Sequence, residues 1–224
     1  IDTTTDTADF GIGFGRAYLD AVYDVAPNLK VEAGLFGTYL SGDADSLTRI
    51  DPRAAIAWAP VDDHWLRAGF MRETSVATST TLAPIGVLGL QSDQIPLAIG
   101  GYSDTFAARW DAQWTDWFFT AVDYQHQQLS DLSILVPLSL DTIDLTAGRI
   151  DRVSFAANTW LTHGFGAFAT FAYADSEDRD PNSPAFGQSL PFVPETAARF
   201  GLTYVNPINL KVTAAATYVG PRSG

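Results

Sequence analysis

The amino-acid sequence predicts an all-β fold in which about ten antiparallel strands follow one another up and down. Three observations support this prediction. Apolar and polar residues alternate with a period of two along most of the 224 residues, short turns separate pairs of alternating stretches, and no apolar run approaches the roughly 18 residues of a membrane-spanning helix. Each strand is therefore expected to present one apolar and one polar face.

The first predicted hairpin shows the alternation clearly. In residues 16–25, Leu19 and Tyr23 fall on one side of the strand and Asp20 on the other. Residues 29–39 repeat this alternation after a short turn that contains proline. Because a short turn joins antiparallel neighbours, we expect these two stretches to pair.

Further hairpins follow along the chain. They are predicted at 49–58 with 66–73, 106–114 with 118–127, 152–161 with 165–173, and 200–204 with 210–218. In each of them large apolar side chains alternate with polar or charged ones, and a short turn joins the two strands.

Long connections that are polar or rich in proline and glycine separate the hairpins, at 41–47, 75–103, 129–148 and 175–194. Compact soluble domains rarely contain structureless loops of about 20 residues, whereas membrane β-barrels alternate short periplasmic turns with long extracellular loops. Strands of about ten residues also match a tilted crossing of the hydrocarbon layer. We therefore predict an antiparallel up-and-down transmembrane β-barrel, with a soluble β-sandwich as the alternative fold.

The placement of tryptophan supports a membrane barrel. Most tryptophans lie within a few residues of a predicted short turn. Indole rings prefer the bilayer interface, where their apolar body and their polar N–H are both satisfied. We expect a membrane-interface girdle formed by Trp58, Trp65, Trp114, Trp117 and Trp160.

Charged residues within the strands share the faces opposite the apolar stripes. A lysine or arginine that faces lipid at the bilayer midplane costs about 2 to 4 kcal/mol. We therefore expect the charged strand residues to face the lumen, namely Arg109, Asp111, Asp123, Arg152 and Lys211. A lumen lined in this way is water-filled or plugged.

The composition excludes several partners and chemistries. Acidic residues number 26 and basic residues 13, and the formal charge of −13 argues against a nucleic-acid partner. The absence of cysteine excludes disulfides, thiolate metal sites and cysteine nucleophiles.

One acidic run is a weak candidate for a calcium site. Asp175, Glu177, Asp178 and Asp180 offer carboxylate oxygens of the kind that Ca²⁺ prefers. The simpler interpretation is a solvated extracellular loop that divalent ions bridge to lipopolysaccharide. We therefore expect no bound metal.

No catalytic arrangement is recognisable in the sequence. The three histidines, His64, His126 and His163, are scattered, and the chain contains no HExxH, GxSxG or P-loop motif. We expect no enzymatic activity, no catalytic residue and no cofactor.

An unusually apolar stretch lies inside the longest connection. Residues 82–99 include Val87, Leu90 and Ile95. Three interpretations stay open: a constriction folded into the lumen, a surface for another chain, or the lining of a ligand site. Residues 134–138 have the same character. For both stretches the alternative is an additional strand or a loop collapsed onto its neighbours.

Several short motifs resemble the barrel of TonB-dependent receptors. Residues 53–60 resemble the family's PR-x-x-x-x-W-x-P strand, residues 64–70 its LRA-x-(Y/F) strand, and residues 82–84 stand where the family has an aromatic-Ala-Pro motif. Residues 104–129 are similar to one of its hairpins. The best match, residues 165–222, contains an F-A-x-x-A-Y-A-D strand and a G-L-x-Y strand. The resemblance extends over most of the chain.

This resemblance implies an integral protein of the bacterial outer membrane that binds or moves a small-molecule solute. Its partners would be outer-membrane lipid, lipopolysaccharide and a periplasmic energy-coupling protein. Outer-membrane barrels linked to tetratricopeptide repeats look similar, so the alternative is a structural or assembly barrel that anchors other chains of an envelope or secretion complex. No plug or other separate domain is recognised in residues 1–224, which we expect to form one segment of a larger barrel.

Overall fold

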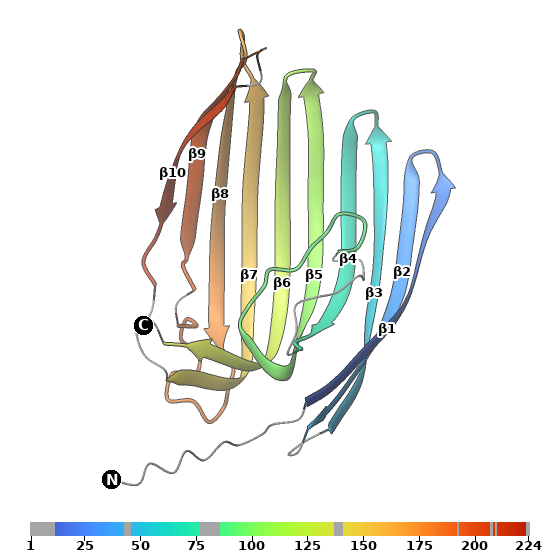
Figure 1. Cartoon of the computed structure of the whole chain (residues 1–224), viewed down its shortest axis with the longest axis vertical. Helices are drawn as coiled ribbons and strands as arrows, with labels where there is room; N and C mark the ends of the chain where they lie inside the picture. Colours follow the sequence, from blue (N-terminus) through green and yellow to red (C-terminus); the bar gives the residue numbers. More distant parts are fainter. Residues whose placement is uncertain are drawn as a thin grey trace.

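The computed structural model describes residues 12–42, 46–76, 86–136, 141–191, 193–206, 208 and 210–222. Within these residues the chain forms one ten-stranded sheet, in which each strand pairs with the next along the chain (Figure 1). The strands are β1 (Ile12–Ala26), β2 (Leu29–Gly42), β3 (Ser46–Val61), β4 (His64–Thr74), β5 (Leu97–Thr115), β6 (Phe118–Leu135), β7 (Thr142–Trp160), β8 (Phe165–Asp178), β9 (Thr196–Val205) and β10 (Lys211–Val219).

Every pairing between successive strands is antiparallel. The predicted all-β, up-and-down fold is therefore confirmed. The alternation of the sequence places successive side chains on opposite faces, and short turns join the strands of each predicted hairpin. Among the described residues, no helix is long and apolar enough to cross a membrane.

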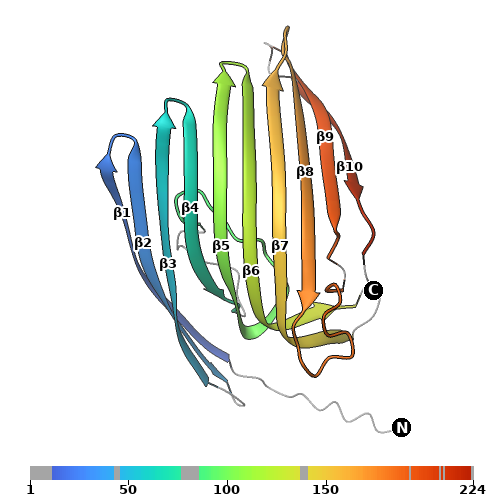
Figure 2. The ribbon, with the colours of Figure 1, turned by 180° about the vertical axis from the view of Figure 1, so that it is seen from behind.

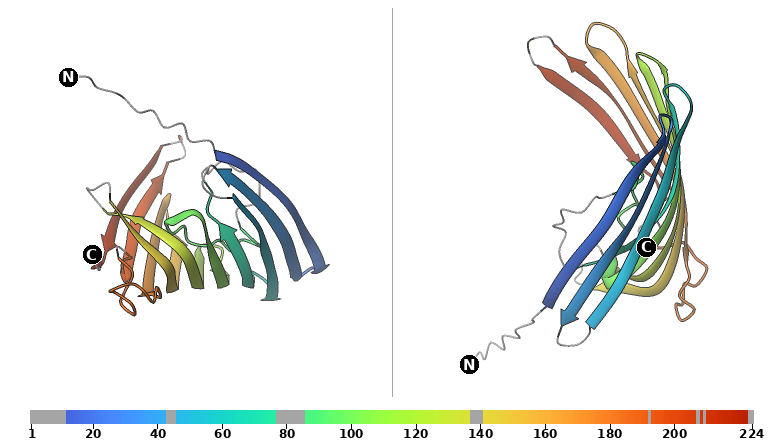
Figure 3. Two further views of the ribbon diagram at one scale, coloured as in Figure 1. Left: turned by 90° about the horizontal axis from the view of Figure 1, so that it is seen from below. Right: turned by 90° about the vertical axis from the view of Figure 1, so that its right-hand side faces the viewer.

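The sheet is curved, so its two faces differ in shape. Seen from below, the ten strands trace an open arc (Figure 3, left). Figure 1 looks onto the concave face and Figure 2 onto the convex face. Within the described residues β1 and β10 each pair with one neighbour only, so the arc has two open edges.

The connections divide between the two ends of the strands. The turns from β1 to β2, β3 to β4, β5 to β6, β7 to β8 and β9 to β10 all lie at the upper end in Figure 1. We call this the short-turn end. The other connections leave and enter the sheet at the opposite end, which we call the long-loop end.

All four predicted long connections had the wrong bounds, because the strands run further than predicted; the connection predicted at 75–103 ends where β5 begins at Leu97. β2 continues to Gly42 and β3 begins at Ser46. β6 continues to Leu135 and β7 begins at Thr142, while β8 reaches Asp178. The predicted connections 41–47, 75–103, 129–148 and 175–194 are therefore partly strand.

The strand ends near the long loops were not predicted, because the polarity of the two faces of the strands reverses at that end. Near the short-turn end, large apolar side chains such as Phe155 and Phe171 are exposed on the convex face. Near the long-loop end the apolar side chains Leu132 and Ile150 are buried on the concave side instead. Apolar and polar positions thus exchange faces along these strands, and the period of two also shifts by one residue between Leu129 and Leu132 in β6 and between Leu145 and Gly148 in β7.

The long-loop ends of β6 and β7 bend under β8 and β9 (Figure 1). Asp131 has a positive φ of 57°, and the pairing of β6 with β7 omits it. Aspartate tolerates this left-handed backbone because its short side chain hydrogen-bonds locally. Thr146, opposite Asp131, is omitted as well, so the register of β6 with β7 does not shift there. The pairing of β5 with β6 does shift in register between Leu97 and Tyr102, as at a β-bulge.

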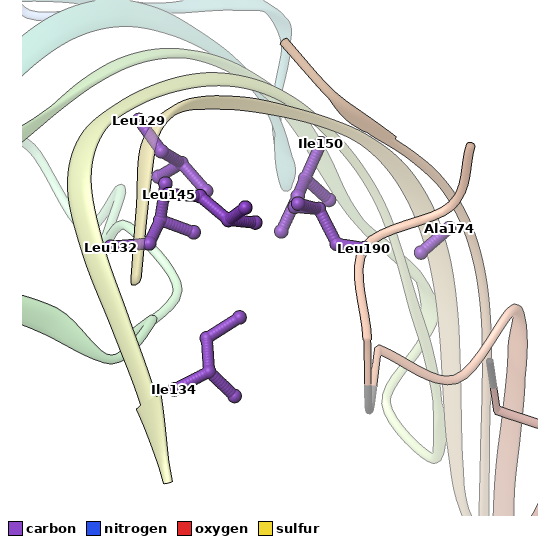
Figure 4. Packing of buried hydrophobic residues seen from close by; sticks show 7 residues of the cluster. All are labelled: Leu129, Leu132, Ile134, Leu145, Ile150, Ala174 and Leu190. Atoms are coloured by element: carbon purple, nitrogen blue, oxygen red, sulfur yellow. The ribbon is translucent and has the colours of Figure 1, made fainter. Parts of the chain in front are cut away.

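The bend creates an apolar cluster on the concave side, shown in Figure 4. Leu190, from the connection between β8 and β9, is buried against β6 and β7. A Cβ on Gly148 would lie only 3.2 Å from Leu190 and 3.3 Å from Leu132, so the glycine gives these two side chains room to pack. The cluster consists of Leu129, Leu132, Ile134, Leu145, Ile150, Ala174 and Leu190.

Candidate functional site

The concave face carries a segment of the connection between β4 and β5. Residues 86–96, which we call the inlaid segment, lie inside the arc of strands (Figure 3, left). Of the three interpretations of the apolar stretch 82–99, folding inward onto the sheet matches this part of it. Residues 82–85 lie outside the described residues.

A tight turn begins the inlaid segment. The backbone N–H groups of Val87 and Leu90 each donate to the carbonyl of the other, at 3.0 and 2.8 Å. Between them Leu88 and Gly89 have positive φ values of 43° and 81°. This is the backbone of a type I′ turn, for which glycine is favoured.

Apolar contacts hold this turn against the sheet. Val87 and Leu90 are 0% and 1% exposed, and they pack with Met71 of β4 in one buried cluster. Ala55 of β3 and Ala107 of β5 complete the cluster. Small alanines on the concave face therefore leave room for the inlaid segment.

Polar side chains of the sheet bind the backbone of the same turn. Glu32 of β2 accepts the N–H of Leu88 through Oε2 at 2.7 Å, and Arg53 of β3 donates from Nη1 to the carbonyl of Gly86 at 2.8 Å. Glu32 and Arg53 are themselves 7% and 8% exposed. Because unpaired backbone groups are costly when buried, these contacts specify the position of the turn.

Two glutamines hold the other end of the inlaid segment. Gln125 of β6 donates to the carbonyl of Gln91 at 2.9 Å, and Gln127 donates to the carbonyl of Asp93 at 3.1 Å. The carboxylate of Asp93 forms an ion pair with Arg152 of β7. The inlaid segment therefore contacts the sheet from β2 to β7.

A cavity of about 370 Å³ lies where the inlaid segment ends. Its walls come from the segment, from β6 to β9, and from the connection between β8 and β9. Most of the lining is apolar, and Arg152 and Asp93 are its charged members. The lining residues are Asp93, Gln94, Ile95, Pro96, Leu132, Ile134, Ile150, Arg152, Ala172, Ala174, Leu190, Pro191, Val193, Pro194 and Ala197.

The predicted lumen-facing residues follow the register of the concave face. Asp111 pairs with both Arg67 and Arg109, the latter at 2.8 Å. Asp123 lies 3.8 Å from Arg152. Lys211 begins β10, pairs with Val205 in register and is exposed. The structure thus joins the first four into two charged groups and leaves Lys211 apart from them.

The predicted girdle tryptophans divide between the two faces. Trp58 pairs with Leu66 on the convex face, and Trp114 lies on the same face against His64 at a ring distance of 5.0 Å. Trp65 pairs with Asp111, and Trp160 pairs with Gly166. These two therefore follow the concave register.

Trp117 lies in the turn between β5 and β6. Trp110, which the girdle prediction omitted, joins the convex group through a ring contact of 5.7 Å with Trp114.

The acidic run is spread over both faces of β8 and the connection after it. Asp175 and Glu177 pair with Arg149 at 3.1 and 3.2 Å, while Asp178 is buried. Asp180 accepts the backbone N–H groups of Thr146 and Asn182, each at 2.9 Å, which hold the pKa of its carboxyl below the usual value. Among the described residues, no group of three or more histidines and carboxylates is arranged to hold a metal ion.

A polar network crosses the convex face of β6 to β8. The carboxylate of Asp151 accepts from the hydroxyl of Tyr124 at 2.8 Å and lies 2.7 Å from Nδ1 of His126. Arg149 approaches the same carboxylate at 3.3 Å. This network marks the row at which the apolar convex surface ends.

The residues that hold the inlaid segment are the part of the site that the sequence did not single out. Gln125 and Gln127 follow the polar register of β6 together with Asp123. The sequence offered one signal for this contact: a row of polar residues on β6, together with a connection that is too hydrophobic to remain in solvent.

An open arc of up-and-down strands, whose convex face is apolar and whose concave face is polar over the half near the short turns, and which carries an inlaid segment on the concave face, is the wall of an outer-membrane-type β-barrel. Comparison with solved structures agrees on this class. No family model matches the sequence, and no curated protein matches it.

The matching structures are TonB-dependent outer-membrane receptors. The copper transporter OprC matches with a TM-score of 0.67 at 16% identity, over 94% of this chain and 35% of its own. The ferric yersiniabactin uptake receptor FyuA from Yersinia pestis matches with a TM-score of 0.67 at 13% identity, over 95% and 35%. The FrpB iron transporter from Neisseria meningitidis has a TM-score of 0.57 at 16% identity, over 91% and 32%.

The chain therefore spans 32% to 35% of the length of these proteins. At such identities the likeness defines the fold alone, which is that of one part of an outer-membrane-type β-barrel.

Proposed function

We propose that this chain forms part of the wall of a bacterial outer-membrane receptor that binds a small solute and moves it across the membrane. The observation that carries the proposal is the reversal of face polarity along the strands. On β5 to β8 the convex surface is apolar over the half near the short turns and polar or charged over the other half, which suits a barrel that is half embedded in lipid.

The apolar band has the height that a bilayer requires. On β8 the convex face is free of charge from Phe165 to Tyr173 and becomes charged at Asp175. This stretch of about nine residues matches the 9 to 11 residues with which a tilted strand crosses the hydrocarbon layer. We assign the convex aromatic residues Trp58, Trp110 and Trp114 to the interface near the short turns.

The concave face suits a solute path. Its charged groups, including Arg109 with Asp111 and Arg152 with Asp123, would be costly in lipid but favourable in a water-filled interior. The inlaid segment lies on this face, so a solute that moves along the wall passes beside it.

The expected partners follow from the same arrangement. Lipid would surround the convex face, lipopolysaccharide would meet the polar network around Asp151, and a periplasmic energy-coupling protein would act at the short-turn end. OprC is described as a copper transporter and FyuA as an uptake receptor for ferric yersiniabactin.

Membrane fractionation and solute measurements test the proposal. The full-length protein should sediment with the outer membrane and migrate faster in an unheated than in a heated detergent gel, because a folded barrel resists the detergent. Cells that lack the gene should accumulate less of at least one small solute, measured by mass spectrometry, and the intact gene should restore it.

Two results would contradict the proposal. Recovery of the protein in the soluble fraction would overturn its location in the membrane. Unchanged solute levels, together with loss of a co-purifying envelope complex, would favour the structural or assembly barrel instead.

A further inference from the structure

The cavity beside Arg152 is the feature with the most specific chemistry on the concave face. Its volume of about 370 Å³ lies within the range of roughly 300 to 1,000 Å³ typical of small-molecule sites. Ile95, Leu132 and Ile134 supply apolar walls. Such a lining favours a molecule with an apolar body.

The guanidinium of Arg152 has N–H donors that are not all used in hydrogen bonds. Its Nη1 contacts the carboxylate of Asp93, and its Nη2 lies 3.8 Å from Asp123, which is beyond hydrogen-bond distance. Its buried Nε has no hydrogen-bond partner within the described part of the chain. Since arginine presents five N–H donors in a planar fork that matches carboxylates, this side chain can donate to the carboxylate of a ligand as it donates to that of Asp93.

Asp93 shows that a carboxylate fits at this position. It comes from the inlaid segment and, like Arg152, lines the cavity. A carboxylate on a ligand would find the same donors and would compete with Asp93 for them.

We propose that this cavity binds a small apolar carboxylic acid, whose carboxylate replaces that of Asp93 on Arg152. Replacement removes the ion pair at the Asp93 end of the inlaid segment, while Gln125 and Gln127 still hold its backbone. Ligand binding is thereby coupled to loss of the ion pair that ties the Asp93 side chain to β7. The inference rests on the proposed function and names a ligand class for the same concave face.

A thiol-protection experiment tests the inference with 4-phenylbutyrate as the probe. Residues 1–224 contain no cysteine, so Ala172→Cys, with any cysteine elsewhere in the full-length barrel replaced by serine, places a unique thiol in the cavity wall. The rate of its alkylation by a water-soluble maleimide should fall as 4-phenylbutyrate is added. The neutral isostere 4-phenylbutanamide should protect the thiol much less.

Two substitutions at one ion pair should have opposite effects. Arg152→Gln should raise the concentration of 4-phenylbutyrate needed for half protection by about tenfold or more, because a charge-assisted hydrogen bond is lost. Asp93→Asn should lower it by roughly threefold, because the competing charge is removed. Arg199→Gln, which changes a concave-face cation that contacts Phe168 outside the cavity, should leave it unchanged.

Several outcomes would overturn the inference. Absence of protection excludes the site. Equal protection by the acid and the amide, independent of Arg152, shows an apolar pocket without carboxylate recognition. Weaker protection in Asp93→Asn shows that Asp93 does not compete with the acid. An unheated gel shift of each variant confirms that the barrel is folded, so a failed site is distinguished from a failed barrel.

Discussion

On the convex face, the half of β7 near the short turns exposes Val153 and Phe155, whereas its half near the long loops places Arg149 and Asp151 on the same face. On the concave face the order is opposite, with Arg152 towards the short turns and the buried Ile150 towards the long loops. Within one strand, therefore, the apolar side chains lie on the convex face near the short turns and on the concave face near the long loops.

The comparison shows where the surroundings of the sheet change. An exposed apolar row is stable only against another apolar phase, and a charged row is stable in water. The exchange between Val153 and Asp151 therefore marks the expected border between bilayer and aqueous phase. Beyond that border the concave face gathers its apolar side chains against its own long-loop connections.

The largest expected difference in stability is between two variants that place the same charge on the convex face, one in each half of β7. Phe155→Arg should destabilise the full-length barrel in bilayers by about 4 kcal/mol, because arginine faces lipid near the midplane. Thr142→Arg, at an exposed position in the other half, should cost less than about 0.5 kcal/mol. Denaturant unfolding, followed by loss of the unheated gel shift, measures both. Similar costs in the two halves would contradict the assigned border.

Removing the apolar anchor of the inlaid segment should have the next largest effect. Leu90 is 1% exposed, and Leu90→Ala should destabilise the docked segment by about 2 to 3 kcal/mol. Hydrogen exchange of residues 86–96 should accelerate while the strands stay protected. Gln91→Ala, at an exposed side chain, is the matched control. Unchanged exchange in Leu90→Ala would show that apolar packing does not hold the segment.

The charge of Glu32 should contribute less than Leu90 to the stability of the docked inlaid segment. Glu32→Gln keeps an oxygen that accepts the N–H of Leu88 but loses the charge, so docking should weaken by about 1 kcal/mol. Exchange at the backbone amide of Leu88 measures this change. Asp24→Asn, in an exposed ion pair with Lys30, should leave that amide unaffected. An equal effect of the two substitutions would point to general charge rather than to this contact.

The smallest expected effect concerns pH at the long-loop end. The pKa of Asp180 is lowered because its carboxylate accepts the N–H groups of Thr146 and Asn182. A lowered pKa stabilises the folded connection above the unfolded value of about 3.9, and this contribution is lost as the pH falls through the folded pKa.

Thr146 amide exchange, corrected for its intrinsic pH dependence, should therefore rise below about pH 4. In Asp180→Asn this rise should be absent. A rise of equal size in the variant would exclude Asp180 as its source.

The fold was largely predictable because each strand's alternation is a local signal. Leu19, Asp20 and Tyr23 alone indicate which face of β1 is apolar. The strand ends beyond Asp151 and Asp175 were harder to predict. Their outward-facing residues are polar, so these ends resemble a polar loop when apolar residues are assumed to face outward.

The site was less predictable because its contacts join distant residues. Leu88 and Glu32 are 56 positions apart, and no local period encodes that pairing. The face of a tryptophan near a turn depends on register, as Trp65 shows by pairing with Asp111. Sequence could identify an apolar connection and a polar row, but not their contact.

Spin-label accessibility along β7 tests the central claim most directly. Residues 1–224 contain no cysteine, so a single labelled thiol can be introduced once any cysteine elsewhere in the full-length protein is replaced by serine. Labels introduced one at a time at positions 153 to 158 of the full-length barrel in bilayers should alternate. Odd positions should collide with oxygen dissolved in lipid, and even positions with a water-soluble nickel chelate. Water accessibility without alternation would contradict the assignment of the convex face to lipid and the concave face to a solute path.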